Sequence, residues 1–303
     1  MHSGGEQRLG GRLPPSEMFP AGVSGIRTRM VTLRSGLRLR VADSGEVDAP
    51  AVLLLHGWGA SIYMWRDWFA PLAASGYRAM AVDLPGHGLS DKPADASAYR
   101  LVPMMQVVRE LLDVERLERV DVVAQSMAGT IALELVLAGE RRITRLALVN
   151  PACFGRVPLL RLAPLVRFEW VGRVMPYLLT RGSVARAHRL VYGDPSRITQ
   201  ENIDQYWAPS QFPAYARALW RLAIGFEWDR QPVALMAQRL GTMPRSAQVV
   251  LGGRDRLVCD STPYVSALVV AGAPLEASVV EAGGHAVNEE LPREVLSLVT
   301  LSR

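Results

Sequence analysis

The hydrophobic positions of this chain form short apolar runs, separated by longer segments with helical spacing. Four apolar runs predict strands that are buried on both faces, at residues 51–55, 78–82, 120–123 and 146–149. Helix-favouring segments at residues 104–117 and 130–138 lie between them. Alternating strands and helices are typical of a doubly wound, mainly parallel sheet.

This pattern stops in the middle of the chain and then resumes. Residues 151–230 contain helix-like segments rich in Leu, Arg, Trp and Tyr, whereas residues 248–251 and 276–280 again resemble sheet strands. We therefore expect one core, made of residues 26–150 and 231–303, with a helical cap at 151–230. Because ligands bind at the strand ends of open α/β sheets, we expect this cap to cover the site.

The first strands of the core differ from the others. Two alternating segments at residues 26–33 and 37–42, joined by residues 34–36, predict a β-hairpin. Residues 1–25 are rich in Gly, Pro and polar residues, so we expect a flexible N-terminal tail. This tail has no apolar signal-peptide region.

Composition narrows the class of protein. Hydrophobic residues form 49% of the 303 residues and charged residues 21%, which is typical of a globular protein. The net charge of +5 comes from scattered arginines, and no nucleic-acid-binding motif is present. No apolar run reaches membrane-spanning length. We expect a soluble, cytoplasmic monomer or homodimer with no nucleic-acid partner and no stable membrane insertion.

Residues 124–129 carry the strongest chemical signal. They join an apolar strand to a helix, and Ser126 has small neighbours at Ala124 and Ala128. A serine on such a sharp turn projects its hydroxyl, and only small residues fit around it. The pattern has alanine where the usual G-x-S-x-G motif has glycine. The alternative interpretation of Ser126 is an ordinary helix N-cap.

A nucleophilic serine needs a histidine base, and the chain contains five histidines. His2 lies in the tail and His188 in the cap, so we expect neither to be held rigidly. His56 and His87 lie beside glycines after strands, where they shape loops. His285 follows Gly283 and Gly284 after the last predicted strand. We therefore predict His285 as the base.

The third catalytic residue orients the imidazole and stabilises its charged form, which requires a carboxylate at another strand end. Asp255 follows the predicted strand at 248–251 and meets this requirement. Asp260 resembles a helix N-cap, and Asn150, at another strand end, is uncharged. The predicted order Ser126, Asp255, His285 is that of hydrolases with a nucleophile elbow.

Acyl transfer also requires donors for the oxyanion. We predict the backbone N–H groups of Met127, directly after the nucleophile, and of Trp58, in the loop between Gly57 and Gly59. Cys153 and Cys259 lack metal-ligand spacing, and we expect both to be free thiols. We expect no metal and no cofactor.

Five segments together resemble the cap-bearing branch of the α/β-hydrolase fold family, which contains esterases, C–C hydrolases, dehalogenases and epoxide hydrolases. They are residues 56–59, 83–91, the Ser126 turn, 252–255 and 283–285. The resemblance implies a mostly parallel central sheet with helices on both faces and a helical cap. It also implies that residues 83–91 form a structural loop. Dehalogenases and epoxide hydrolases of this family carry aspartate at the elbow, so Ser126 disfavours those activities.

The resulting hypothesis is a serine carboxylesterase that acts on a small-molecule ester with a short to medium acyl chain. The alternatives are a C–C hydrolase of vinylogous diketones and a receptor without turnover. Segment 159–179 packs over the site or, alternatively, lies on a lipid surface. We expect large cap residues mainly to hold the cap together, with pocket lining as the alternative, namely Phe168, Trp170, Met175, Tyr177, Leu178, Trp207, Phe212, Tyr215 and Trp220.

Overall fold

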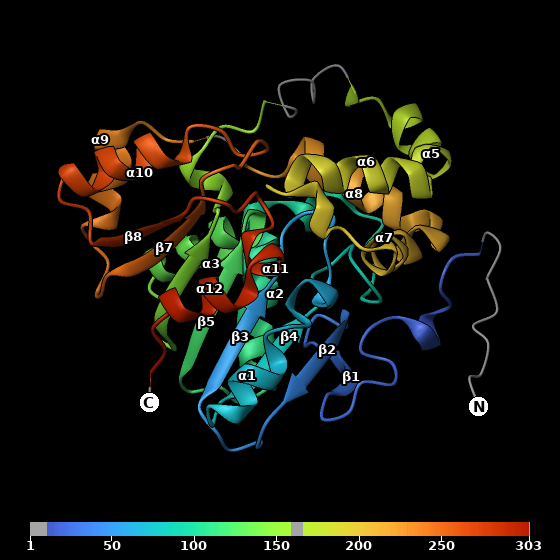
Figure 1. Ribbon diagram of the computed structural model, residues 1–303, viewed down its shortest axis with the longest axis horizontal. Coiled ribbons are helices and arrows are strands. Elements are labelled where there is room, and N and C mark those ends of the chain that lie inside the picture. The colour runs from blue at the N-terminus through green and yellow to red at the C-terminus, as the bar shows by residue number, and fades with distance from the viewer. Residues whose placement is uncertain (1–10, 159–165, 229, 303) are drawn as a thin grey trace.

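The centre of the protein is a twisted sheet of eight strands (Figure 1). The computed structural model describes residues 11–158, 166–228 and 230–302. The strands are β1 (Arg27–Thr32), β2 (Arg38–Ser44), β3 (Ala51–Leu55), β4 (Arg78–Val82), β5 (Val120–Gln125), β6 (Ile143–Val149), β7 (Ala247–Gly252) and β8 (Leu275–Val280). Their spatial order is β1-β2-β4-β3-β5-β6-β7-β8. β1 and β2 pair antiparallel, as does β2 with β4, and the remaining pairs are parallel. The predicted mostly parallel sheet is confirmed.

Two hydrophobic cores lie on opposite faces of this sheet. Along β3, Leu53 and Leu55 belong to one core, whereas Val52 and Leu54 belong to the other. This alternation follows from the two-residue period of a strand, and it explains why β3 is a continuous apolar run. All five residues of β3 are buried.

Helices cover both faces, as expected. One core includes side chains of α2 (Leu101–Val114), α3 (Met127–Leu137), α9 (Val233–Leu240) and α10 (Ser261–Val270). The other includes side chains of α1 (Phe69–Ala74), α11 (Val287–Glu290), α12 (Pro292–Leu298) and the 3₁₀ turn η2 (Ile62–Trp65). Trp65 and Trp68 pack edge to face in this second core, with ring centroids 5.0 Å apart.

Among the described residues, four helices form the cap, and Figure 1 shows them grouped beyond one end of the strands. They are α5 (Glu169–Leu178), α6 (Arg181–Val191), α7 (Gln200–Trp207) and α8 (Pro213–Gly225). Capping boxes at Thr180 and Thr199 define the starts of α6 and α7. Within α5, Gly172 packs so tightly on Trp220 of α8 that a Cβ there would lie 2.6 Å from the indole.

Two segments differ from the expected organisation. Residues 151–158, expected at the start of the cap, pack on the core, because Arg156 pairs with Cys259 in a β-bridge and Phe154 lies against Tyr264. Within the expected flexible tail, Met18 and Phe19 are buried, and the Phe19 N–H donates to Gln205 Oε1 at 2.9 Å. These contacts anchor the described end of the tail to α7. Residues 1–10 lie outside the described part.

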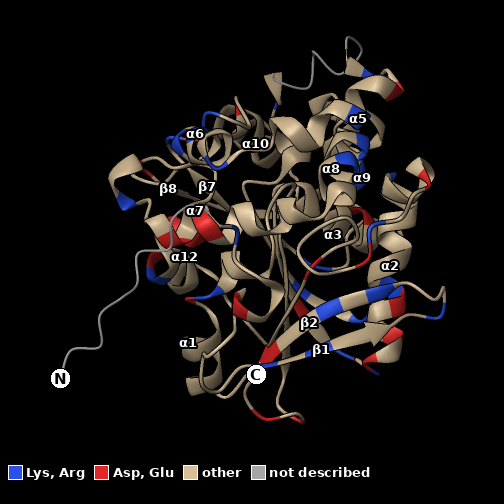
Figure 2. Ribbon diagram, turned by 90° about the vertical axis from the view of Figure 1, so that its right-hand side faces the viewer, with Lys and Arg blue, Asp and Glu red and all other residues tan. Residues whose placement is uncertain are grey.

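Many arginines of the hairpin side of the molecule are paired with carboxylates. Figure 2 shows basic and acidic residues interspersed over β1, β2 and α2. Arg29 pairs with Asp43 and Glu115, and Arg78 Nη2 lies 3.0 Å from the same Glu115. The positive charge of this region is therefore balanced locally rather than gathered into a basic surface.

Candidate active site

Ser126 occupies a strained turn between β5 and α3. Its backbone has φ 54° and ψ −118°, outside the regions that non-glycine residues normally adopt. The Ser126 N–H donates to Val149 O at 2.9 Å, and Ser126 O accepts from Ala152 N at 3.0 Å. Ala124 and Ala128 are fully buried beside it. The alanines therefore leave the sharp turn intact.

The three residues that the sequence predicted as catalytic meet in the structure. His285 Nε2 lies 2.9 Å from Ser126 Oγ, and His285 Nδ1 lies 2.7 Å from Asp255 Oδ2. The other carboxylate oxygen, Asp255 Oδ1, accepts the N–H groups of Leu257 and Val258 at 2.8 and 2.9 Å. These bonds fix the carboxylate, which in turn orients the imidazole toward the serine.

Asn150 and Gln125 hold the His285 loop. Asn150 Nδ2 donates to Gly284 O at 2.9 Å and to His285 O at 3.0 Å, while its Oδ1 accepts the Gly252 N–H at 2.8 Å. Gln125 Nε2 also donates to His285 O, at 3.0 Å. In the sequence Asn150 was excluded as the third catalytic residue because it is uncharged. Its position at a strand end was the signal for its role, which is to join neighbouring loops.

Glu290 joins the same loop to the cap and was not singled out from the sequence. Its carboxylate accepts three backbone N–H groups, from Gly284 at 2.9 Å, Gly193 at 3.0 Å and Asp194 at 2.7 Å. The Ala286 N–H donates to Val191 O, so the end of α6 contacts the loop directly. This part of the cap and the histidine loop are therefore bound as one unit.

His56 and His87 shape loops, as predicted. His56 lies between Gly57 O and the Leu84 N–H, at 2.8 and 3.0 Å. His87 Nε2 accepts the Gly59 N–H at 3.1 Å. Burial lowers the pKa of both imidazoles, His56 and His87, so both rings are neutral. His56 donates to Gly57 O and accepts from Leu84, and His87 accepts from Gly59, so both rings position the loop at 57–59.

The loop at 83–91 also has the structural role that the resemblance implied. Asp83 Oδ1 accepts the Ile62 N–H at 2.8 Å, and Asp83 Oδ2 accepts the Leu89 N–H at 2.9 Å. Asp83 O accepts the Ser90 hydroxyl at 2.5 Å. Each oxygen of this residue thus supports the chain around it.

The two predicted oxyanion donors are the backbone N–H groups of Trp58 and Met127. Neither the Trp58 N–H nor the Met127 N–H donates to any acceptor in the described part of the chain. Met127 is the first residue of α3, where unpaired N–H groups and the helix dipole favour negative charge. Trp58 is fixed through its side chain, since Nε1 donates to Leu219 O of the cap at 2.9 Å.

A cavity of about 370 Å³ lies between the core and the cap, and His285 and Trp58 line it. Its apolar wall includes Met64, Met175, Leu178, Leu179, Val184, Leu190, Val191, Tyr215, Leu219 and Leu257. Polar groups are few and include Gln125, His188, Tyr206 and Glu289. An apolar cavity with a few convergent polar groups is typical of a site for a small organic substrate.

The large cap residues have several roles. Met175, Leu178 and Tyr215 line the cavity. Trp220 is buried, and Trp207 Nε1 donates to Leu179 O, so these two hold the cap together. Three others are exposed, namely Phe168, Trp170 and Tyr177.

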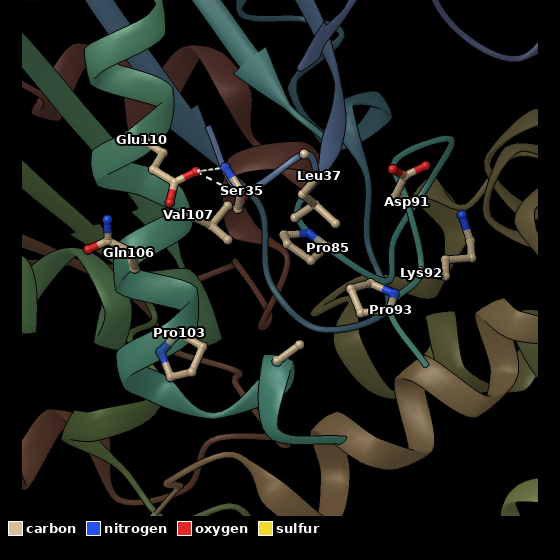
Figure 3. A pocket seen from close by; sticks show the side chains of 12 residues that line it. Ser35, Leu37, Pro85, Asp91, Lys92, Pro93, Pro103, Gln106, Val107 and Glu110 are labelled. Atoms are coloured by element: carbon tan, nitrogen blue, oxygen red, sulfur yellow. Dashed lines mark hydrogen bonds between the residues drawn. The ribbon is translucent and has the colours of Figure 1, made fainter. Parts of the chain in front are cut away.

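A larger hollow, of about 660 Å³, opens on another part of the surface between the β1–β2 turn, α2 and the loop around Lys92 (Figure 3). Figure 3 shows Glu110 of α2 hydrogen-bonded to Ser35, whose N–H and hydroxyl donate to it at 3.0 and 2.8 Å. His285 and Trp58, which line the smaller cavity, do not border this hollow. The smaller cavity is therefore the candidate active site.

The described part of the chain comprises residues 11–158, 166–228 and 230–302. This part of the chain holds no cluster of three metal-ligating side chains. None of its helices is long and apolar enough to cross a membrane. Cys153 and Cys259 are both free, as predicted. Burial raises the pKa of the Cys153 thiol to about 12, so it is protonated at neutral pH.

The sheet, the serine turn and the cap define an α/β protein of the hydrolase class. The chain belongs to the alpha/beta hydrolase family, whose model matches residues 52–298. It is 41% identical over 119 residues to a haloalkane dehalogenase of Psychrobacter cryohalolentis, a match that covers 38% of each chain. The chain thus matches about two fifths of that relative's length.

Solved structures with the same fold include a putative aryl esterase from Burkholderia cenocepacia. It has a TM-score of 0.71 and 18% identity, and the match covers 89% of this chain and 95% of the esterase. An epoxide hydrolase from an endophytic Streptomyces has a TM-score of 0.73 and 22% identity, with 91% and 94% covered. These likenesses concern the fold.

Proposed function

We propose that this protein is a serine carboxylesterase with Ser126 as nucleophile, His285 as base and Asp255 as the residue that orients the base. The observation that carries the proposal is the continuous row of contacts from Ser126 Oγ through His285 to Asp255, at 2.9 and 2.7 Å. These distances lie within hydrogen-bond reach, as proton transfer requires. The free N–H groups of Trp58 and Met127 supply the oxyanion donors.

The reaction has two halves. Ser126 Oγ forms a bond to the ester carbonyl carbon while His285 takes the hydroxyl proton, and the oxyanion accepts hydrogen bonds from Trp58 and Met127. The C–O bond to the alcohol then breaks, and His285 protonates the leaving oxygen. In the second half His285 takes a proton from water, and the hydroxide forms a bond to the acyl carbon. The bond between that carbon and Ser126 Oγ then breaks, His285 returns the proton to Oγ, and the acid leaves.

The same chemistry separates this chain from its dehalogenase relative. Displacement of a halide by a carboxylate gives an alkyl ester, which water hydrolyses at the carbonyl carbon. Displacement by Ser126 would give an alkyl ether, which has no carbonyl and cannot be hydrolysed in that way. We therefore propose acyl transfer rather than alkyl-halide cleavage.

The cavity favours a neutral ester. Neither lysine nor arginine is found among the described residues that line it, whereas Glu289 does line it. A substrate with a free carboxylate would thus lack a cationic partner, which disfavours acidic diketone substrates of C–C hydrolases. A volume of about 370 Å³ suits an acyl group of short to medium length.

The test is hydrolysis of p-nitrophenyl esters with acyl chains from acetate to dodecanoate, on the native protein and on Ser126→Ala. We expect repeated turnover that is fastest between butyrate and octanoate, and a loss of at least about a thousandfold in kcat in the variant. A single slow event per protein molecule would instead indicate a receptor. Cleavage of vinylogous diketones without ester turnover would indicate a C–C hydrolase.

A further inference from the structure

His188 is a buried histidine that the proposed mechanism does not use. It lies on α6 with 5% of its surface exposed, and it lines the same cavity as His285. Its ring packs edge to face on Tyr206 of α7, with centroids 4.4 Å apart. The expectation that a cap histidine is loosely held is therefore wrong, because packing between α6 and α7 fixes the ring.

The polar neighbours of His188 are already paired with one another. Glu289 Oε1 lies 2.5 Å from Arg66 Nη1, so the carboxylate has a cationic partner. Glu289 Oε2 accepts the Tyr206 hydroxyl at 2.6 Å, and Asn202 Nδ2 lies 3.3 Å from Oε1. The Tyr206 proton is thus committed to the carboxylate and is not available to His188.

The imidazole of His188 has one nitrogen engaged and one left over. Nδ1 lies 3.1 Å from Val184 O, and because a carbonyl oxygen only accepts, Nδ1 carries the proton. Nε2 then has a lone pair, and no group in the described part of the chain donates to it. Burial lowers the pKa of His188, which favours this neutral form.

We propose that Nε2 of His188 accepts a hydrogen bond from a hydroxyl or N–H group of the substrate. The inference rests on the proposed esterase function and specifies its substrate class, an ester with an apolar body and one hydrogen-bond donor. Because His188 lines the cavity, a ligand that covers Nε2 without donating to it leaves this acceptor unpaired, which penalises a ligand that lacks the donor. His188 is thus a residue that determines specificity, distinct from Ser126 and His285.

The kinetic test compares esters that differ only by hydroxyl against methyl. The pairs are methyl 3-hydroxyhexanoate with methyl 3-methylhexanoate, methyl 6-hydroxyhexanoate with methyl heptanoate, and 4-hydroxybutyl butyrate with pentyl butyrate. Hydrolysis of each ester is measured by the acid that it releases. For at least one pair, the hydroxyl-to-methyl ratio of kcat/KM should fall about tenfold in His188→Leu. His188→Gln, which retains an acceptor, should recover part of it. Ratios that agree within about twofold in native protein and His188→Leu, for every pair, would overturn the proposal.

A second measurement does not depend on turnover. The Ser126→Ala variant is labelled with nitrogen-15 histidine, and the NMR signal of His188 Nε2 is assigned by its loss when His188→Gln is added. This signal should move when a hydroxylated ester is bound. The methyl isostere should leave it in place.

The hydroxyl of Tyr192 is buried without a partner in the described residues, and the rings of Tyr192 and His188 are 6.0 Å apart. A shifted Nε2 signal in ligand-free Tyr192→Phe would mean that Tyr192 already occupies Nε2, against the proposal.

The two measurements separate the possible failures. Hydrolysis of all six esters with unchanged ratios and an unmoved Nε2 signal would contradict the role of His188 and leave the esterase function standing. No hydrolysis of any ester, together with a moved Nε2 signal, would contradict the esterase function and support the hydrogen bond at His188.

Discussion

Replacement of Asn150 by alanine tests whether one buried amide holds the loop that carries His285. Asn150 is fully buried, and its side chain makes three hydrogen bonds, to Gly252, Gly284 and His285. These bonds connect the ends of β6 and β7 to the loop that carries the predicted base. Asn150→Ala removes all three bonds and takes this partner from the Gly252 N–H and Gly284 O inside the protein, whereas His285 O keeps its bond from Gln125 Nε2.

The size of the effect follows from these contacts. Three buried hydrogen bonds at about 1 kcal/mol each give about 3 kcal/mol. Asn150 also has φ 43°, a left-handed conformation that asparagine tolerates better than alanine, which adds about 1 kcal/mol. For a chain of 303 residues, a loss of about 4 kcal/mol lowers the Tm by about 6 °C. Since His285 O loses one of its donors, the imidazole is positioned less firmly, and kcat should fall about tenfold.

The assay is thermal unfolding of Asn150→Ala beside Asn288→Ala, combined with ester hydrolysis. Asn288 is a matched control because it is also fully buried, yet neither of its side-chain polar atoms has a partner in the described part of the chain. Its removal leaves a small cavity but eliminates two unpaired polar groups, so we expect less than half the loss seen at Asn150. Equal changes in the Tm of the two variants would refute the reasoning.

Two further predictions concern the loops around the site. A Cβ at Gly57 would overlap Gln125 Oε1 and lie 2.9 Å from Ser126 Cβ, so Gly57→Ala should lower kcat/KM by at least about tenfold. Gly59→Ala would meet no atom within 4 Å but places alanine at φ 76°, a strain of about 1 kcal/mol, so it should lower kcat/KM less than Gly57→Ala does. Full activity of Gly57→Ala would contradict this account. Burial lowers the pKa of Lys92 from its ordinary value of 10.5 to about 8. Between about pH 8 and 10 the folded protein has therefore lost a proton that the unfolded chain still holds. Over this range the free energy of unfolding should therefore rise with pH relative to that of Lys92→Met, whereas parallel pH profiles of the two proteins would contradict the lowered pKa of Lys92.

The fold was largely predictable because buried parallel strands carry a strong pattern. The predicted strands at 51–55 and 78–82 coincide with β3 and β4, and the strand before Ser126 extends only two residues further, to Gln125. The sequence also predicted that Ser126, Asp255 and His285, which are far apart in the chain, lie together, and the structure places them in contact. Strand ends in a parallel sheet share one edge, which makes such a prediction possible.

What the sequence did not predict depends on contacts between distant segments. The burial of Phe19 follows from its fit against Tyr63 and Phe69, and no local pattern specifies it. His188 has a fixed ring because Tyr206 packs on it from another helix. Asn150 carries no charge, so a search for catalytic groups passes over it. Such roles arise from packing geometry, which sequence spacing alone does not define.

The central claim is that Ser126 is the nucleophile, and covalent labelling tests it most directly. The native protein and Ser126→Ala are treated with a fluorophosphonate, which reacts with an activated serine, and are then digested for peptide mass mapping. We expect one phosphonyl group on the peptide that contains Ser126, formed much more slowly in His285→Ala, and none in Ser126→Ala. Equal labelling of native protein and Ser126→Ala, or a label on another peptide, would contradict the account.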